Sequence, residues 1–211
     1  MTALMKALAM PRAYPQAARR CAGLCAMCGP QPGHTLIELL IVVVLTTILF
    51  ATGVPALHSI LARLQLRAAV ADLQGAIDLT RSQALGRGNP VTLAPLEPAG
   101  QDWRRGWIVF ADANGNRRPD PGEPIFFRHR PLPDGITVST VFSSGTSPDY
   151  LAYNGAGRGC DATNSQAARW GTLSLRQGDH IRRIKIGMLG RMRVCDPDVD
   201  GASCGGGPDG P

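Results

Sequence analysis

The feature that most constrains this chain is an apolar block of 22 residues between Leu36 and Leu57, in which Glu38 is the only formally charged residue. At about 1.5 Å per residue, a helix of this length spans about 33 Å, which matches a hydrocarbon core of about 30 Å. The sequence therefore predicts one membrane-spanning helix. With 211 residues in total, the chain has room for one ordinary domain beside it.

The charge distribution predicts how this helix is oriented. The formal net charge is +6, and residues 1–33 contain four basic residues and no acidic residue. Because basic segments stay on the cytoplasmic side, we expect the N-terminus in the cytoplasm and the C-terminal domain across the membrane. A cleaved secretory signal is disfavoured because the apolar run exceeds the usual core of about 7–15 residues.

Glu38 needs a partner, because a charge buried in a bilayer costs about 2.5–3.5 kcal/mol on insertion scales. Around it, residues 33–42 read GHTLIELLIV, so a glycine ends the basic leader and a glutamate follows five residues later in an aliphatic run. This pattern closely resembles the processing motif of type IV pilins and type II secretion pseudopilins.

The resemblance implies roles for three residues. A prepilin peptidase would cut after Gly33, remove residues 1–33 as a cytoplasmic leader and methylate the new N-terminus at His34, where the family usually has Phe. Glu38 would pair with the N-terminal amine of a neighbouring subunit. Residues 34–57 would be the inner-membrane and assembly helix, with the following domain in the periplasm. The leader is long for this family, so Met10 and Met27 are alternative start positions.

Residues 58–89 continue the helical pattern. Apolar residues recur there at spacings of three, four and seven, and the run ends at the sequence GRGNP; the stripe comprises Leu66, Val70, Leu73, Ile77 and Ala84. We interpret this stripe as the face that an amphipathic helix packs against a globular domain. Pro55 lies where pilin helices often carry a kinking proline.

Residues 90–195 predict a β-rich globular domain, because short apolar runs alternate there with Gly, Pro, Asn and Asp clusters. A helix on an antiparallel sheet makes the fold α+β and type IV pilin-like. Three segments, WIVFAD at 107–112, LAYNG at 151–155 and GRMR at 190–193, resemble in this order the globular domain of the FimT/GspH family of minor pilins and pseudopilins. Residues 196–211, rich in Gly, Pro and Asp, predict a flexible C-terminal tail.

The loop at residues 112–123 has the spacing of a calcium-binding EF-hand loop. Oxygen-bearing side chains stand at its first, third, fifth, ninth and twelfth positions, namely Asp112, Asn114, Asn116, Asp120 and Glu123. However, Arg117 replaces the turn glycine, Arg117 and Arg118 add positive charge, and strands are expected on both sides. We therefore interpret the segment as a hairpin loop rich in turn residues, and we predict no metal site and no cofactor.

Residues 182–194 predict a basic β-hairpin. If residues 188–190 form a three-residue loop with Gly190 left-handed, Ile186 faces Met192 and Ile184 faces Val194, which puts the apolar residues on one face. The opposite face then gathers four cations, Arg183, Lys185, Arg191 and Arg193. Because like charges opposed across strands are unfavourable, this face requires an acidic neighbour or an anionic ligand, unless the cations only protect a strand edge.

The family resemblance favours DNA as that ligand. A Gly-Arg-x-Arg motif in FimT-type minor pilins is associated with DNA binding during natural transformation, and it matches Gly190, Arg191 and Arg193. Arginine also matches phosphate oxygens bidentately. We therefore predict DNA binding by Arg191, Arg193, Arg183 and Lys185. No aromatic residue lies in the hairpin, so this binding would be sequence-independent and salt-sensitive.

The six cysteines fall into two groups. Cys21, Cys25 and Cys28 have the spacing of a radical SAM iron–sulfur loop, which we reject because the leader is expected to be removed and has no barrel around it. The other three, in an oxidising compartment, allow one disulfide within the chain. Cys195 with Cys204 would close a short loop, and Cys160 with Cys195 would join two strands. Sequence does not decide between these pairings, and we favour the first.

We do not expect an enzyme, because the four His show no metal-ligand spacing and no Ser/His/Asp or Cys/His catalytic set can be assembled. We therefore expect a FimT-like minor pilin of a type IV pilus that contributes to pilus assembly and to DNA binding or uptake. Its partners would be the prepilin peptidase, other pilin subunits, the inner membrane and DNA. The alternative is a GspH-type pseudopilin of the type II protein secretion system, with no nucleic-acid role.

Overall fold

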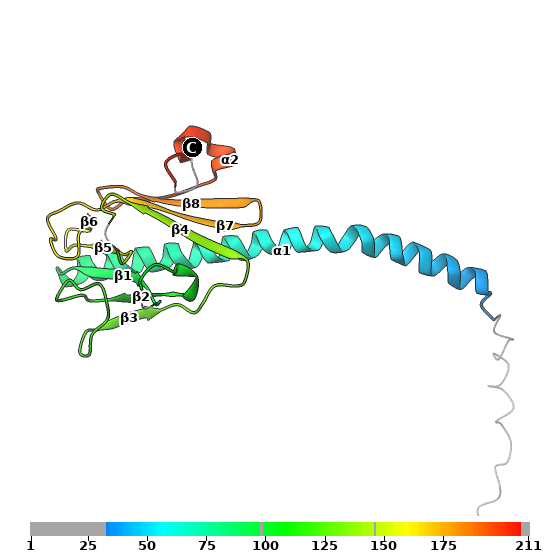
Figure 1. The fold of residues 1–211 in the computed structure, drawn as a ribbon, viewed down its shortest axis with the longest axis horizontal. Coiled ribbons are helices and arrows are strands. Elements are labelled where there is room, and N and C mark those ends of the chain that lie inside the picture. The colour runs from blue at the N-terminus through cyan, green and yellow to red at the C-terminus, as the bar shows by residue number, and fades with distance from the viewer. Residues whose placement is uncertain (1–32, 98, 146, 208–211) are drawn as a thin grey trace, which may run out of the picture. The chain divides into compact units, whose positions relative to one another are not determined.

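The computed structural model describes residues 33–97, 99–145 and 147–207, and the chain divides into two compact units between Phe50 and Ala51. Helix α1, Leu36–Arg87, contributes to both units (Figure 1). It begins after Thr35, whose hydroxyl accepts a hydrogen bond from the backbone N–H of Glu38 at 3.3 Å. It ends where Gly88 adopts a φ of 67°, which is typical of a helix C-terminus. The helix therefore ends at residue 87 and not at the predicted residue 89.

The described part of the first unit, residues 33–50, leaves every side chain exposed. Its hydroxyls turn back onto the helix, where Thr46 donates to the Val42 carbonyl at 2.9 Å and Thr47 to the Val43 carbonyl at 2.7 Å. Such bonds satisfy a hydroxyl without water. Among the described residues, α1 is the one helix long and apolar enough to cross a membrane.

The second half of α1 packs into the globular domain through the predicted stripe. Its five residues are each at most 5% exposed, which confirms the interpretation of this face as core; they are Leu66, Val70, Leu73, Ile77 and Ala84. The neighbouring Thr80 is also fully buried, and its hydroxyl donates to the Ala76 carbonyl at 2.6 Å. The helix therefore presents an apolar surface to the sheets without an unsatisfied polar group at this position.

The domain contains two antiparallel sheets, ordered β3-β2-β1-β5-β6 and β4-β7-β8-β9, which confirms the α+β prediction. The strands are β1 Val91–Pro95, β2 Trp107–Phe110, β3 Ile125–Arg128, β4 Ile136–Phe142, β5 Leu151–Tyr153, β6 Gly159–Cys160, β7 Gly171–Gln177, β8 His180–Ile186 and β9 Met192–Cys195. A short 3-10 helix, η1 Trp103–Arg105, precedes β2. The pattern of apolar runs did not predict β6, which is only two residues long.

One buried cluster joins α1 to both sheets. Leu73 of α1 belongs to it together with Val91 and Val109 of the first sheet and Leu173 and Ile184 of the second. In Figure 1 the C-terminal half of α1 lies between strands β1–β3 and strands β4, β7 and β8. Both sheets therefore bury apolar residues against the same helix.

The C-terminal segment differs from the predicted flexible tail. Residues 197–204 form helix α2, Pro197–Asp200, and the 3-10 helix η2, Gly201–Cys204. The Asp196 side chain accepts the Asp198 N–H and so caps α2, and a disulfide joins Cys195 to Cys204 with a Cα–Cα separation of 5.8 Å. We call residues 196–207 the C-terminal cover. The Gly, Pro and Asp residues that indicated flexibility serve here as caps and turns.

Candidate functional site

The β8–β9 hairpin has the predicted register. Ile186 pairs with Met192, Ile184 with Val194 and Lys185 with Arg193. Gly190 has a φ of 77°, and a Cβ at this position would lie 2.2 Å from the Gly157 carbonyl oxygen. Only glycine fits there without displacing the backbone, because other residues disfavour this φ and carry the clashing atom.

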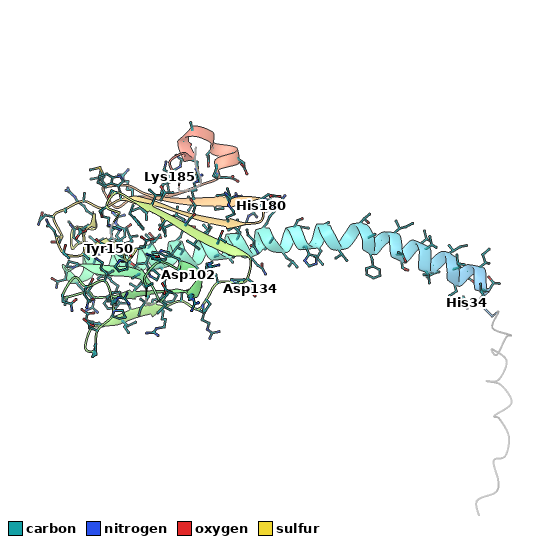
Figure 2. All side chains as sticks on the ribbon, in the orientation of Figure 1. His34, Asp102, Asp134, Tyr150, His180 and Lys185 are labelled. Atoms are coloured by element: carbon teal, nitrogen blue, oxygen red, sulfur yellow. A yellow bond between two sulfur atoms is a disulfide. The ribbon has the colours of Figure 1, made fainter. Side chains whose placement is uncertain are left out.

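The cations of this hairpin differ strongly in exposure. Arg183 is 2% exposed and donates from Nη1 to the Cys204 carbonyl at 2.8 Å. Lys185, labelled in Figure 2, donates from Nζ to the Gly205 carbonyl at 2.9 Å. By contrast, the Arg193 side chain is 55% exposed and Arg191 is also exposed. The four predicted DNA-binding residues therefore do not form one accessible face.

The C-terminal cover supplies the acidic neighbour that the hairpin requires. Arg193 Nη2 lies 3.7 Å from the Asp200 carboxylate and 3.2 Å from the Ser203 hydroxyl, and Arg182 forms an ion pair with Asp196. Carbonyl groups at the end of η2 accept the remaining charge-assisted bonds, because a helix C-terminus leaves such acceptors unpaired. The inclusion of Arg183 in an exposed DNA site is therefore corrected, since the cover buries this guanidinium.

The sequence interpretation missed Arg182, Asp196 and Asp200 as members of this cluster. Two signals were available, namely the aspartates at positions 196, 198 and 200 that directly follow the basic strand, and the two cysteines that enclose them. The structure confirms the favoured pairing of Cys195 with Cys204. Cys160 is a free, buried thiol, and burial raises its pKa to about 11.

The N-terminal motif lies at the start of α1. Gly33, His34 and Thr35 precede the helix, and Glu38 occupies its first turn, where the helix dipole favours a negative charge. Figure 2 labels His34 at this end of the helix. The predicted cleavage site, methylation site and assembly carboxylate therefore follow one another in an exposed segment. Residues 1–32 of the predicted leader, including its three cysteines, lie outside the described residues.

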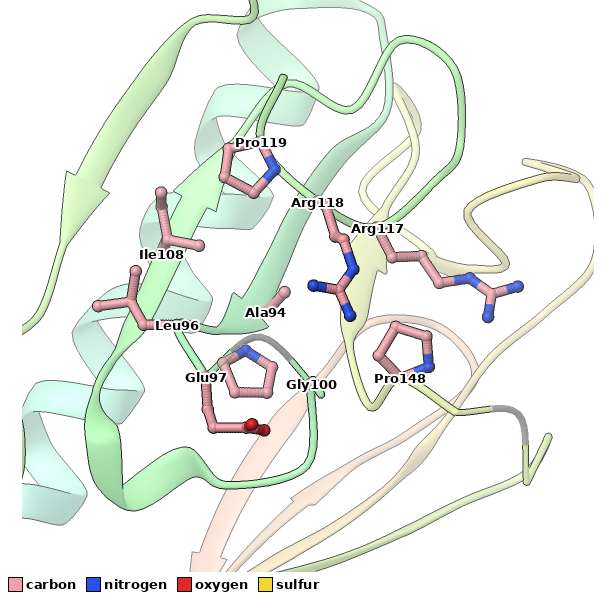
Figure 3. A pocket seen from close by; sticks show the side chains of 10 residues that line it. Ala94, Leu96, Glu97, Gly100, Ile108, Arg117, Arg118, Pro119 and Pro148 are labelled. Carbon is pink, nitrogen blue, oxygen red and sulfur yellow. The ribbon is translucent and has the colours of Figure 1, made fainter. Parts of the chain in front are cut away.

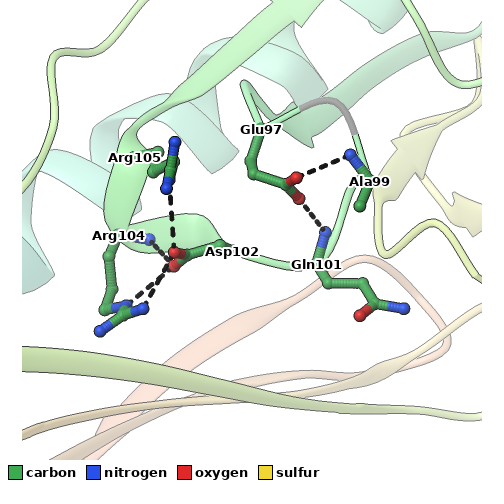
Figure 4. Close-up of polar contacts among 6 residues, drawn as sticks. All are labelled: Glu97, Ala99, Gln101, Asp102, Arg104 and Arg105. Atoms are coloured by element: carbon green, nitrogen blue, oxygen red, sulfur yellow. Dashed lines mark hydrogen bonds and ion pairs between the residues drawn. The ribbon is translucent and has the colours of Figure 1, made fainter.

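A pocket of about 250 Å³ lies at the end of β1, lined by Leu96, Glu97, Arg118 and Pro148 among others (Figure 3). Beside it, the Glu97 carboxylate accepts the Ala99 N–H at 2.8 Å, a backbone bond that lowers the pKa of Glu97 (Figure 4). The Asp102 carboxylate accepts Arg104 Nε at 2.9 Å, and this side-chain bond lowers the pKa of Asp102. These carboxylates hold a loop and a helix cap in place and do not form a catalytic pair.

The fold and the N-terminal motif together define a class: the chain is a minor pilin or pseudopilin of a type IV pilus or type II secretion system. Residues 30–54 match the prokaryotic N-terminal methylation motif, and residues 69–190 match the family described as type II transport protein GspH. The chain belongs to this GspH family, whose members are structural subunits.

Two solved structures are similar in fold. The type IV minor pilin FimU of Pseudomonas aeruginosa is 16% identical, with a TM-score of 0.49 over 70% of this chain and 96% of FimU. The minor pseudopilin EpsH of the type 2 secretion system of Vibrio cholerae is 12% identical, with a TM-score of 0.44 over 63% of this chain and 98% of EpsH. No curated protein matches the sequence at a significant level.

Proposed function

We propose that this chain is a FimT-like minor subunit of a type IV pilus. It is held in the inner membrane as a single-pass precursor, with its N-terminus in the cytoplasm and its C-terminal domain in the periplasm. A prepilin peptidase cuts after Gly33 and methylates His34, and the helix then enters the filament. The supporting observation is the aliphatic surface of α1, which is exposed from Leu36 to Leu61 wherever its side chains are described and carries Glu38 in its first turn.

The Glu38 carboxylate explains how this surface selects its partner. Aliphatic contacts alone do not fix the register between neighbouring helices, whereas a carboxylate that needs a cation in an apolar environment does. The N-terminal amine of the adjacent processed subunit supplies that cation. Assembly therefore depends on cleavage, because the amine at His34 exists only after the leader is removed.

The assembly proposal is tested with Glu38→Leu, which replaces the carboxylate with an apolar side chain. The variant should still insert and be cleaved, so that mass spectrometry finds an N-terminus at His34 with one added methyl group. It should be absent from purified filaments, whereas the control Ile41→Leu should be incorporated. Incorporation of Glu38→Leu at the wild-type level would contradict the proposal.

A second activity, sequence-independent DNA binding, is supported by the exposed guanidinium groups of Arg191 and Arg193. Fluorescence anisotropy of the full chain in detergent, across a salt series, tests it. Arg191→Gln with Arg193→Gln should weaken binding and flatten its salt dependence. Arg128→Gln with Arg130→Gln removes the same charge from exposed positions on and just after β3 and should bind like the wild type. Equal affinities for both double variants would end the DNA proposal.

The pseudopilin alternative gives a different phenotype. If the chain serves type II secretion, its deletion abolishes export of secreted proteins and leaves DNA uptake intact. If it serves a pilus, deletion reduces piliation or DNA uptake and leaves protein export intact. Measuring export and DNA uptake in the same deletion strain separates the two.

A further inference from the structure

The loop between β2 and β3 holds several of its side-chain oxygens with hydrogen bonds from its own backbone. Asp112, Asn114, Asn116, Asp120 and Glu123 occupy the side-chain ligand positions of a twelve-residue calcium loop, and the seventh position is Arg118, which contributes a backbone carbonyl in such loops. The presence of two arginines and the lack of the turn glycine argued against calcium at the level of sequence. The structure answers these two objections, and the third expectation, a strand on each side of the loop, is confirmed by β2 and β3.

Arg117 takes the conformation for which a calcium loop normally uses glycine. Its φ is 66°, and among the described residues it is the one non-glycine residue with a positive φ. Its backbone N–H donates to Asp112 Oδ2 at 2.9 Å. The absence of glycine at this position therefore does not prevent the sharp turn, because the backbone already makes it.

The two arginine side chains point away from the loop interior. Arg117 Nη1 donates to the Ser147 carbonyl at 3.3 Å, and its guanidinium lies 5.0 Å from the centre of the Tyr150 ring. Arg118 lines the separate pocket at the end of β1, as Figure 3 shows. The positive charges that the sequence places in this segment are thus directed at other parts of the domain.

Asp112 supplies the observation that indicates a cation. The residue is 5% exposed, and its Oδ2 accepts the Arg117 N–H at 2.9 Å. The N–H groups of Gly115 and Asn116 also lie close enough to lower its pKa, so the carboxylate lies against the backbone of this turn. Its second oxygen, Oδ1, is buried and has no hydrogen-bond partner among the described residues. An ionised carboxylate oxygen in this state is unfavourable unless it is paired. Burial, followed by the nearby charge of Glu123, raises the pKa of Asp112.

The other oxygens are held in place by the loop's own N–H groups. Asn114 Oδ1 accepts the Asn116 N–H at 3.0 Å, and Asn116 Oδ1 accepts the Arg118 N–H at 2.8 Å. Glu123 spans the loop, with Oε1 accepting the Ala113 N–H at 2.9 Å and Oε2 the Asp120 N–H at 3.0 Å. A carbonyl or carboxylate oxygen has a further lone pair beyond the one used in each bond, so each of these atoms retains acceptor capacity.

We propose that this loop binds one Ca²⁺ ion through the side chains of Asp112, Asn114, Asn116, Asp120 and Glu123 and the backbone carbonyl of Arg118. Mixed carboxylate and carbonyl ligands in an irregular loop suit Ca²⁺, whereas Mg²⁺ demands a near-ideal octahedron and keeps its waters. Asp120 Oδ2 accepts the side-chain amides of Asn114 and Asn116 at 2.7 Å and 2.6 Å. When the ion binds, Asp120 gives up these two hydrogen bonds and coordinates the metal.

Calcium at this position has a structural consequence for the domain. Gly115 lies inside the loop, and a Cβ there would come within 2.9 Å of the Ala162 carbonyl oxygen. The loop therefore packs against the segment that follows β6, and an ion that stiffens it also fixes this contact. The proposed site is independent of both filament assembly and DNA binding.

The test uses the full chain in detergent after treatment with EDTA. Calorimetric titration with CaCl₂ should show one site with a Kd of about 10⁻⁴–10⁻³ M, the range of extracellular calcium modules, and MgCl₂ should bind more weakly. Asp112→Asn and Glu123→Gln should each weaken binding at least tenfold. Asp134→Asn removes an exposed carboxylate outside the loop and should bind like the wild type.

Thermal unfolding without calcium shows whether each variant folds. If Asp112→Asn does not fold, Glu123→Gln takes its place in the calcium titration. The proposal is overturned if the wild type shows neither heat nor a rise in Tm with CaCl₂ at about ten times the weakest Kd of that range. It is also overturned if the folded Asp112→Asn protein binds calcium as tightly as the wild type.

Discussion

The basic β8–β9 hairpin and the β2–β3 loop each place several charged side chains on a short stretch of chain. At the hairpin, the C-terminal cover, which follows β9, pairs with the charges through Cys204, Gly205 and Asp200. At the loop, the partners are its own backbone N–H groups and the side-chain amides of Asn114 and Asn116, and one buried oxygen of Asp112 has none among the described residues. The sequence predicted a ligand at the hairpin and none at the loop, whereas the fold pairs most of the hairpin cations internally and leaves one carboxylate oxygen of the loop unpaired among the described residues.

The difference has a physical basis in how each partner is held. The cover is fixed by a disulfide with a sequence separation of nine residues, which keeps its carbonyls and carboxylates beside β8 and β9. The β2–β3 loop has no such link, and its carboxylates are paired with backbone N–H groups and side-chain amides of the loop itself. The hairpin cations are paired within the chain, so an added anion can bind only those that stay exposed. The unpaired oxygen of Asp112 instead favours an added cation.

The largest expected effect comes from breaking the disulfide with Cys204→Ser. Closing a loop of this length contributes about 2–3 kcal/mol to the free energy of unfolding in the chain-entropy model, and urea unfolding should show a loss of that size. DNA affinity should rise, because the cover no longer holds Arg183 and Lys185. Reduced wild-type protein is the control and should match the variant; an unchanged unfolding midpoint would show that the cover is held by its other contacts.

Calcium should have the next largest effect. At ten times its Kd, an ion that binds only the folded state adds about 1.4 kcal/mol, which corresponds to a rise in Tm of about 3–6 °C for a domain of this size. Differential scanning calorimetry with CaCl₂, and with MgCl₂ as control, measures it. An equal rise with both salts would indicate a general ionic effect and would remove the contrast between loop and hairpin.

The pH dependence of stability should reveal the Asp112 carboxylate. Its pKa is raised in the folded state by burial and by Glu123, so its ionised form destabilises the calcium-free protein at pH above that raised pKa. This unfavourable contribution disappears as the pH falls toward the ordinary value of 3.8. Urea unfolding in EDTA should therefore show Asp112→Asn more stable than wild type at neutral pH, with the difference shrinking on acidification. A stability difference that does not change with pH would contradict the raised pKa of Asp112.

The smallest effect concerns a single carboxylate of the cover. Asp200→Asn removes the negative charge beside Arg193 and preserves the acceptor for the Asp196 N–H, which lies 2.8 Å from Asp200 Oδ2. An exposed ion pair of this kind is worth about 0–1 kcal/mol, so DNA affinity should rise by at most about fivefold. Asp179→Asn, in the exposed turn between β7 and β8, adds the same net charge and should leave affinity unchanged. Equal gains in both variants would indicate a net-charge effect.

Much of the fold follows from local sequence patterns. The apolar stripe of α1 predicts its buried face because helical spacing places those residues on one side. The β8–β9 register is predictable because a shift by one residue would place Lys185 among the apolar residues of the inner face. The short strand β6 was not predictable, since two residues carry no periodicity.

The sequence by itself determined the long helix with its N-terminal motif, the antiparallel sheets and the location of the charged residues, because each depends on neighbours along the chain. Only the tertiary structure decided which charges are available. It buried Arg183 under the cover, turned Arg117 and Arg118 away from the loop interior and left Asp112 Oδ1 without a partner among the described residues. These outcomes depend on contacts between segments far apart in sequence, where a side chain's partner is set by packing and not by spacing.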